Sequence, residues 1–566
     1  MFAVSEFMRR REFWIILVLI ILAASCRIAV AHYLANDAPD DGRVYAQIAR
    51  NVLEQHVYSH ADQPPYEPSL IRLPGYPLFL ASIYAIFGHG NNGAVRIVQA
   101  LIDSATCGLV ALLAFYWQPD EKKKFVTAVA ALIVAALCPF TMIYAGTILT
   151  EVPTMFLAVA MCVAATLAFR NTFTTEHTEK TRSERKGFRR ALLWWGVAGW
   201  LGGMAVLIRP DSGLFAAAIG LTLVLSCLFR LRERWRATLF AASVFSLAFV
   251  LVLVPWTIRN ARVFHLLQPL APAHGEMPGE FVPRGYQQWL RTWLDDEVYI
   301  GPFLWSLDSE QIKLDQIPPR AFDSKEEKAQ VAALLEKYNH PPETESANTA
   351  EAGTTGQQPQ PSPTPEEQAG DENDQSDKND QADDEADQGN NENNDNGDEP
   401  AQTPEPGSVE MTSEIDAGFA QIARERISRH PIRFYFWLPI KRAGTMWFNT
   451  HSQYWPWDGE LFPLDDLDYD THQQYWLPLF AGLTWVYMLL GLAGGWVLWR
   501  ARKFQARRWL LLATLLIFLR LVFFSTLENP EPRYVVEFFP FLAVLGGIAV
   551  SRIIPIAAVP AAQSRE

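Results

Sequence analysis

The amino-acid sequence predicts an all-α protein that crosses a membrane about ten times, and two observations lead to this expectation. First, apolar residues gather in blocks close to the ~20 residues that a helix needs to cross the core of a bilayer. Second, the mean hydropathy of +0.02 hides these blocks, because one acidic segment offsets them. Residues 341–410 contain 20 Asp and Glu and a single basic residue, Lys378, so this segment carries −19. Since the whole chain carries −14, the remainder carries +5.

The apolar blocks define the expected spans and exclude two classes of protein. A purely soluble enzyme would not contain so many of them. A scaffold built on disulfides is also excluded, because all five cysteines lie inside apolar blocks, where a free thiol behaves as a small hydrophobic group. The expected spans are residues 13–33, 94–116, 125–146, 154–170, 191–208, 212–229, 237–256, 475–498, 509–526 and 535–555.

The basic loops predict how the chain is oriented, since Lys and Arg are retained on the cytoplasmic side of a membrane. With ten crossings, the basic residues of 9–11, 122–124, 170–190, 230–236 and 500–508 all fall on one side. We therefore expect a multi-pass protein of the plasma (inner) membrane with both termini in the cytoplasm and an uncleaved first span. The outer side then holds residues 34–93, 146–153, 209–212, 257–474 and 528–534.

The chain divides into five parts by composition. Residues 341–412 are acidic, and we expect them to be disordered because they cannot bury enough apolar surface to offset the loss of chain entropy. A spacer role is favoured over attraction of Ca²⁺ or of an acceptor. The other parts are an N-terminal membrane module with the first outer loop at 34–93, an ordered outer part, an outer amphipathic and aromatic part, and the last membrane helices: residues 1–260, 261–340, 413–474 and 475–566.

The first outer loop opens an amphipathic helix with two carboxylates. Asp40 and Asp41 precede apolar positions at Tyr45, Ile48 and Val52, which follow the spacing of three and four residues that marks one helix face. One interpretation is that a carboxylate caps this helix. Capping needs only one of the two, and a carboxylate at the lipid–water boundary is also where a base would meet a lipid-borne substrate.

Short motifs stand at the outer ends of the spans. They are residues 36–45 (NDAPDDGRVY), 69–81 (SLIRLPGYPLFLA), 86–88 (IFG), 148–153 (ILTEVP), 208–210 (IRP), 255–260 (PWTIRN) and 531–534 (EPRY). In this order and placement, the set resembles the integral-membrane GT-C glycosyltransferases, in particular RgtA/B/C/D-like proteins, the aminoarabinose transferases of lipid A and the protein O-mannosyltransferases. The resemblance covers the chain to about Asn260 and the last three spans, but not the acidic segment.

The resemblance implies a GT-C fold and inverting transfer of a sugar from a polyprenyl-phosphate donor to a hydroxyl outside the membrane. The acceptor would be a glycolipid, a polysaccharide or a protein, and nucleic acid is not an expected partner. In such proteins an acidic residue stands one helical turn before a Tyr or its equivalent, which Asp41 and Tyr45 match best. Where relatives often carry Asp-Glu, this chain has Asp41-Gly42 preceded by Asp40, so the choice between the two aspartates stays open. Tyr45, Tyr76, Trp256 and Asn260 are the candidates for substrate binding.

These residue types suit the chemistry independently of any family. A hydroxyl is a weak nucleophile, so a carboxylate within hydrogen-bond reach helps to remove its proton; Asp41 is our first candidate and Asp40 the second. A phosphate leaving group needs cations rather than a second acid, and arginine matches phosphate oxygens as a planar fork. The candidates for the donor phosphate are Arg72, Arg209, Arg259 and Arg533, with Tyr534. Each arginine alone is also explained as a snorkelling interfacial side chain.

Glu151 is the third catalytic candidate, because an ionised group in an apolar turn between two spans is costly unless it is paired. The plain interpretation is that it favours the N-terminus of the next helix, near Pro153. In related proteins a second acidic residue in this turn faces the active site, where it would orient the acceptor or hold a metal. We predict no definite cofactor; a divalent metal stays open, and His56, His60 and Asp62 have no zinc-like spacing.

Three alternatives complete the predictions. The aromatic residues of 447–458 are read first as an interfacial belt and second as a sugar-stacking surface. A transporter or flippase for a lipid-linked or small anionic substrate would instead place charges near span centres and repeat in two halves, which the outer charges do not favour. A third alternative is a non-catalytic scaffold that presents the acidic segment. Such a scaffold would lose its function when the acidic segment is removed, and a substitution of Asp41 would have no effect.

Overall fold

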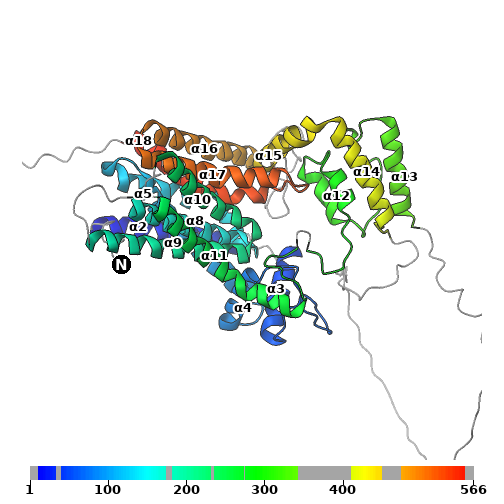
Figure 1. The fold of residues 1–566 in the computed structure, drawn as a ribbon, viewed down its shortest axis with the longest axis horizontal. Helices are drawn as coiled ribbons and strands as arrows, with labels where there is room; N and C mark the ends of the chain where they lie inside the picture. The colour runs from blue at the N-terminus through cyan, green and yellow to red at the C-terminus, as the bar shows by residue number, and fades with distance from the viewer. Residues whose placement is uncertain are drawn as a thin grey trace, which may run out of the picture.

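The computed structural model describes residues 10–33, 40–173, 182–230, 235–272, 275–341, 409–448 and 473–554. Within these ranges all regular secondary structure is helical, and a long helical bundle carries smaller helical units at one end (Figure 1). The predicted acidic segment, apart from its edges, and most of the predicted aromatic stretch, from Asn449 onward, lie outside the described residues.

Among the described residues, nine helices are long and apolar enough to cross a membrane, and a bent pair brings the number to ten. The prediction of an all-α polytopic membrane protein is confirmed. The spanning helices are α2 (Arg10–Tyr33), α5 (Asn92–Trp117), α8 (Glu151–Phe173), α9 (Arg182–Ile208), α10 (Gly213–Arg230), α11 (Trp235–Val263), α16 (Gln473–Arg500), α17 (Phe504–Ser525) and α18 (Phe539–Ile553), the last preceded by η10 (Pro532–Phe538).

The predicted span at 125–146 is present as a bent pair of helices. The segment is broken between α6 (Lys124–Ala136) and α7 (Pro139–Met142), which continues into η2 (Ile143–Gly146), and the two halves are bent by 56°. Cys138 takes an extended conformation at the break. The cause is Pro139, because a proline lacks the amide donor that a helix interior needs and disfavours helical geometry in the residue before it.

Small residues allow the spans to approach closely, as expected where lipid removes the hydrophobic drive between helices. A Cβ on Gly199 of α9 would meet the backbone oxygen of Phe245 in α11, and one on Gly494 of α16 would meet that of Leu545 in α18. In the most apolar window of α18, 94% of the residues are buried, against 17% in α2 and in α11. The last span is therefore central to the bundle, and α2 and α11 lie at its edge.

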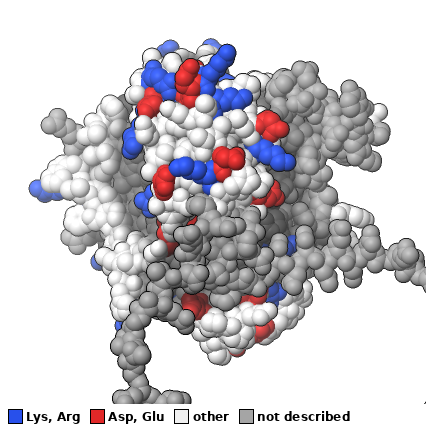
Figure 2. Space-filling view, turned by 90° about the vertical axis from the view of Figure 1, so that its right-hand side faces the viewer, with Lys and Arg blue, Asp and Glu red and all other residues white. Residues whose placement is uncertain are grey.

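The segments on either side of the acidic stretch pack together into one outer unit. It contains α12 (Arg284–Leu290), α13 (Lys325–Asn339) and α14 (Ser413–Arg429). Tyr286 and Trp289 of α12 pack on Phe419 of α14. The expected helical face of α14 is present, since Phe419 and Ile422 are buried. Figure 2 looks onto this end of the molecule and shows basic and acidic side chains interspersed over its upper part.

The first outer loop contributes two packed helices at the same end of the bundle (Figure 1). The predicted amphipathic helix is α3 (Asp40–Glu54), which buries Ile48 and Ala49. It packs against α4 (Gly75–Phe87) and against Ile208 at the end of α9. We call this end of the bundle, with α3, α4, α15 (Leu438–Phe448) and the outer unit, the outer end.

Candidate functional site

Asp41 lies between two arginines that come from distant parts of the chain. Its Oδ1 atom accepts a hydrogen bond from Nη2 of Arg72 at 2.7 Å, and its Oδ2 atom accepts one from Nη1 of Arg533 at 3.2 Å. Arg72 stands in the loop before α4, and Arg533 stands in η10 before α18. Both oxygens of this carboxylate are therefore engaged by cations at the outer end.

Asp41 is the second residue of α3, and its carboxylate is held by these two guanidinium groups. The side chain of Asp40 lies outside the described residues. Burial raises the pKa of Asp41, but Arg533 and then Arg72 more than offset this effect, so the pKa lies below its ordinary value. The carboxylate is thus held in its ionised form.

Arg533 is held from the other side by Glu531. Its Nη2 donates to Oε1 of Glu531 at 3.1 Å, and its Nε also pairs with this carboxylate. The hydroxyl of Tyr534 donates to the same Oε1 at 3.1 Å. Burial raises the pKa of Glu531, although Arg533 opposes the shift. The EPRY motif therefore forms a rigid support that points a guanidinium at Asp41.

Aromatic rings pack beneath this pair. Tyr45 lies one turn after Asp41, with its ring 5.8 Å from the Arg72 guanidinium carbon, and packs edge-on against Tyr76. Burial raises the pKa of Tyr45 to about 12, so this phenol stays protonated. The hydroxyl of Tyr76 donates to Oε1 of Gln99 at 2.8 Å. Tyr76 is fully buried.

Arg259 of α11 forms a separate cationic position nearby. Its Nη1 donates to the backbone oxygen of Ser69 at 2.8 Å and to Oδ1 of Asn260 at 3.0 Å. The rings of Trp256 and Tyr58 lie 4.8 and 5.5 Å from its guanidinium carbon. The hydroxyl of Tyr58 also donates to the backbone oxygen of Arg72. Among the described residues, no carboxylate forms an ion pair with Arg259, and Tyr58 is its titratable neighbour.

Glu151 belongs to a second, deeper ion-pair network around Arg209. Nη1 of Arg209 lies 2.7 Å from Glu151 and 3.3 Å from Glu537, and its Nε lies 3.0 Å from Asp211. Arg520 of α17, which is fully buried, pairs with Asp211 at 2.5 Å and with Glu537 at 2.8 Å. Three carboxylates thus face two arginines, and Arg209 contacts all three of them.

Tyr534 connects the two networks. Its ring lies 5.3 Å from the guanidinium carbon of Arg209 and 5.5 Å from that of Arg533. The structure therefore brings all of the predicted site residues whose side chains it describes into one region at the outer end. They are Asp41, Tyr45, Arg72, Tyr76, Glu151, Arg209, Trp256, Arg259, Asn260, Arg533 and Tyr534.

Several partners in this region were not predicted. Glu531 stood inside a quoted motif without a role, and Asp211, Arg520 and Glu537 were missed. The signal for the last two was present, because charged residues inside apolar spans are costly and mark functional or paired positions. Their partners come from other helices and could not be read from the sequence.

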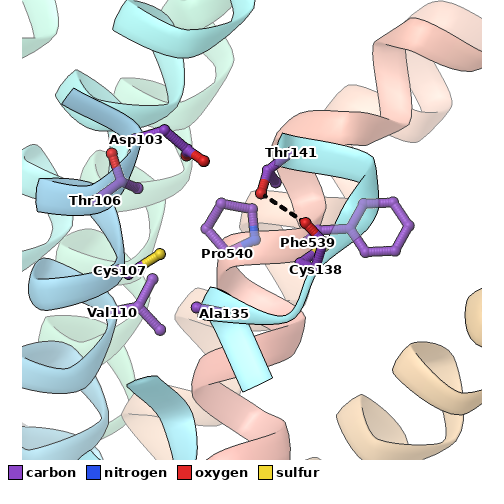
Figure 3. A pocket seen from close by; sticks show the side chains of 9 residues that line it. All are labelled: Asp103, Thr106, Cys107, Val110, Ala135, Cys138, Thr141, Phe539 and Pro540. Atoms are coloured by element: carbon purple, nitrogen blue, oxygen red, sulfur yellow. Dashed lines mark hydrogen bonds between the residues drawn. The ribbon is translucent and has the colours of Figure 1, made fainter. Parts of the chain in front are cut away.

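A further buried ion pair lies near the centre of α5, away from this region. Nε of Arg27 lies 2.5 Å from Asp103, and Nη2 and Nη1 of Arg27 donate to the backbone oxygens of Ala135 and Ala136 at the end of α6. The cavity beside Asp103 measures about 10 Å³, the space of one water molecule. Figure 3 shows it closed in by residues of α5, by the α6–α7 break and by the start of α18. A charge at a span centre is what the transporter alternative predicts; here Arg27 binds Asp103 and the backbone oxygens at the end of α6, beside the helix break.

The fold and the site together define a multi-pass helical membrane protein with a charged site at the outer ends of its spans. Among the described residues, no three His, Cys, Asp or Glu side chains are grouped as metal ligands would be. No family model matches the sequence, and no curated protein matches it.

Two solved structures are similar to this chain. One is ArnT from Cupriavidus metallidurans bound to undecaprenyl phosphate, with 14% identity over 95% of this chain and 78% of that chain and a TM-score of 0.33. The other is the same protein in the apo state, with 15% identity over 94% and 77% and a TM-score of 0.33. ArnT is a GT-C aminoarabinose transferase, which is the class that the sequence motifs resemble. At a TM-score of 0.33 the likeness gives no correspondence between individual residues of the two chains.

Proposed function

We propose that this protein is a glycosyltransferase that moves a sugar from a polyprenyl-phosphate donor to an acceptor hydroxyl on the extracytoplasmic side of the membrane. The observation that carries the proposal is the contact of Asp41 with both Arg72 and Arg533 at the outer end of the bundle. A carboxylate and several guanidinium groups at a lipid boundary combine a base for a hydroxyl with cations for a lipid phosphate.

The transfer is a single displacement at the anomeric carbon of the donor sugar. The acceptor oxygen forms the new bond to this carbon while its proton passes to Asp41. The bond between the anomeric carbon and the phosphate oxygen breaks, and its electron pair leaves with the phosphate. The products are the glycosylated acceptor, with inverted configuration, and polyprenyl phosphate. No second acid is needed, because a phosphate leaves as a stable anion.

Three of the four predicted arginines suit the donor phosphate. Arg72 and Arg533 face Asp41, and Arg259 contacts oxygens and rings rather than a carboxylate. Guanidinium groups in such positions bind phosphate oxygens through parallel hydrogen bonds. Arg209 is surrounded by three carboxylates, so we assign it, with Glu151, to positioning the site rather than to the phosphate.

The proposed partners are the bilayer, a polyprenyl-phosphate sugar and a hydroxyl acceptor on a glycolipid, a polysaccharide or a protein. Trp256 and Asn260 border the Arg259 position and are proposed to line the donor side of the site. The membrane is proposed to be the plasma (inner) membrane, with both termini on its cytoplasmic side, since the basic loops then lie in the cytoplasm.

A transfer assay tests the proposal. Purified protein in detergent is given a panel of radiolabelled polyprenyl-phosphate sugars together with membrane extract as acceptor, and wild type is compared with Asp41→Asn. We expect transfer from at least one donor and a loss of about 10²- to 10⁴-fold in Asp41→Asn. Glu54→Gln is the matched control, because Glu54 is a carboxylate of the same helix that faces His89 at the surface. Full activity in Asp41→Asn, or no transfer by wild type from any donor, would contradict the proposal.

A further inference from the structure

Asp41 and a bound phosphate would need the same guanidinium groups. Arg72 directs Nη2 at Oδ1 of Asp41, and Arg533 directs Nη1 at Oδ2. Nη2 of Arg533 donates to Glu531, and its Nε forms an ion pair with the same carboxylate. Each nitrogen of Arg533 thus faces one of two carboxylates, so a phosphate that approaches this guanidinium competes with Asp41 and Glu531.

The chemistry of inversion makes the conflict sharper. In a single displacement the acceptor and its base stand on one face of the sugar, and the leaving group stands on the other. In inverting glycosidases the two carboxyl groups are about 6.5–9.5 Å apart for the same reason. A phosphate bound to the guanidinium groups that Asp41 contacts at 2.7 and 3.2 Å would stand beside the base, with no room for a sugar between them.

We propose that Asp41 occupies the phosphate position in the donor-free protein, and that the donor phosphate displaces it from Arg72 and Arg533 and so frees it to act as the base. This inference rests on the proposed function. It makes the observed ion pairs a resting state in which the base is held by the cations that the substrate later uses, so the base becomes available only when a donor is bound.

The burial of the three side chains fits this exchange. Arg533 is 12% exposed and anchored by buried Glu531, whereas Asp41 and Arg72 are 27% and 30% exposed. The Nε atom of Arg72 is buried and donates to no partner among the described residues. Arg533 is therefore a fixed point, while Asp41 and Arg72 have room to move and Arg72 has a donor to spare for a phosphate.

The charged and titratable groups around Asp41 come from three elements. Arg72 approaches from the loop before α4, Arg533 and Glu531 approach from the segment at η10, and Tyr45 lies on α3 itself. The two arginines favour ionised Asp41, and Glu531 opposes it. When a phosphate neutralises the arginines, the remaining neighbours all favour the protonated carboxyl, so the bound donor makes Asp41 a stronger base.

A binding measurement tests the displacement separately from catalysis. The probe is undecaprenyl phosphate in detergent, titrated against wild type, Asp41→Asn, Arg72→Gln and Glu54→Gln and followed by tryptophan fluorescence. We expect Asp41→Asn to bind the lipid phosphate about three- to tenfold more tightly than wild type, since the competing carboxylate is gone. Arg72→Gln should bind more weakly, and Glu54→Gln should match wild type.

Any other result of the binding measurement contradicts either the displacement or the proposed function. Equal or weaker binding by Asp41→Asn, or no binding by wild type, overturns the displacement. If Asp41→Asn loses transfer but keeps wild-type affinity, the displacement fails while the proposed function stands. If no donor supports transfer but Asp41→Asn binds more tightly, the proposed function fails while the shared phosphate position stands.

A pH profile of wild type gives a second measurement that needs no variant to fold. The profile of kcat/KM reports the free enzyme, and that of kcat reports the donor complex. Displacement predicts that the acid limb of kcat lies at higher pH than the acid limb of kcat/KM. Coincident limbs would overturn the inference.

Discussion

Asp41 and Arg533 are 492 positions apart in the chain, and their side chains meet at 3.2 Å. One opens the helix after the first span, and the other opens the last span. The most buried span of the bundle therefore delivers a cation to the carboxylate of the first outer loop. This contact couples the packing of the bundle to the proposed chemistry.

The first prediction concerns the pH dependence of the Arg533→Gln variant. Of the two cations that lower the pKa of Asp41, Arg533 has the larger effect. Its removal should therefore move the acid limb of kcat/KM to higher pH. In wild type the limb should lie below about pH 3.9, the ordinary value of an aspartate. The control is Arg43→Gln, because Arg43 is an exposed arginine on the same helix as Asp41; this variant should leave the acid limb in place. An acid limb that does not move in Arg533→Gln would refute the pairing of Arg533 with Asp41.

The same pair has a predictable effect on stability. Because the pKa of Asp41 is lower in the folded protein, its contribution is complete above the unfolded pKa near 3.9 and is lost as the pH falls through the lower folded value. Thermal unfolding in detergent between pH 3 and pH 7 should show wild type and Asp41→Asn converging at the acid end. Curves that stay parallel would speak against the shift.

The two arginines that hold Asp41 should differ in their importance for stability. Arg533→Met leaves buried Glu531 without its cation, and breaking such a pair costs about 3 kcal/mol. Arg72→Gln removes a partly exposed pair, worth about 0–1 kcal/mol. Chemical unfolding in detergent should therefore separate the two variants clearly, while both should raise the KM for the donor. Equal stability of the two would show that Arg533 is not the anchored member.

The deeper network predicts a rescue by a second substitution. Arg520→Met leaves three carboxylates around Arg209 alone, and we expect a loss of about 3 kcal/mol. Adding Glu537→Gln removes one of those charges and restores the original balance, so the double variant should recover part of the loss. The midpoint of thermal unfolding in detergent measures this, with exposed Arg507→Gln as the control. A double variant less stable than Arg520→Met would contradict the charge-balance explanation.

Gly75 is predicted to set the spacing between the first outer loop and the end of α9. A Cβ at this position would lie 2.6 Å from the backbone carbonyl of Leu207, two residues before Arg209. Gly75→Ala should therefore push the Arg72 loop away, with a loss of about 1–3 kcal/mol and weaker donor binding. Gly220→Ala in α10, where no atom lies within 4 Å of the new Cβ, should leave both quantities unchanged, and a neutral Gly75→Ala would show that the contact does not position the loop.

The membrane spans and the amphipathic first-loop helix could be predicted from the sequence, because both depend on the order of apolar residues along a single segment. The break after α6 was hidden in the same pattern, since an apolar run of sufficient length looks continuous although Pro139 interrupts it. The arginines at the ends of the spans could be picked out in the sequence, because each stands beside an apolar block where a charge must face water or a partner.

The tertiary structure alone decided which charges meet. Arg209 and Arg533 look alike in the sequence, as arginines at the outer ends of spans, yet Arg209 is enclosed by three carboxylates and Arg533 is shared between Asp41 and Glu531. Spacing along the chain indicates the depth of a residue in the membrane, because each helix rises by a constant amount per residue. It does not indicate which helices are neighbours, since that depends on how small residues and buried charges let the spans pack.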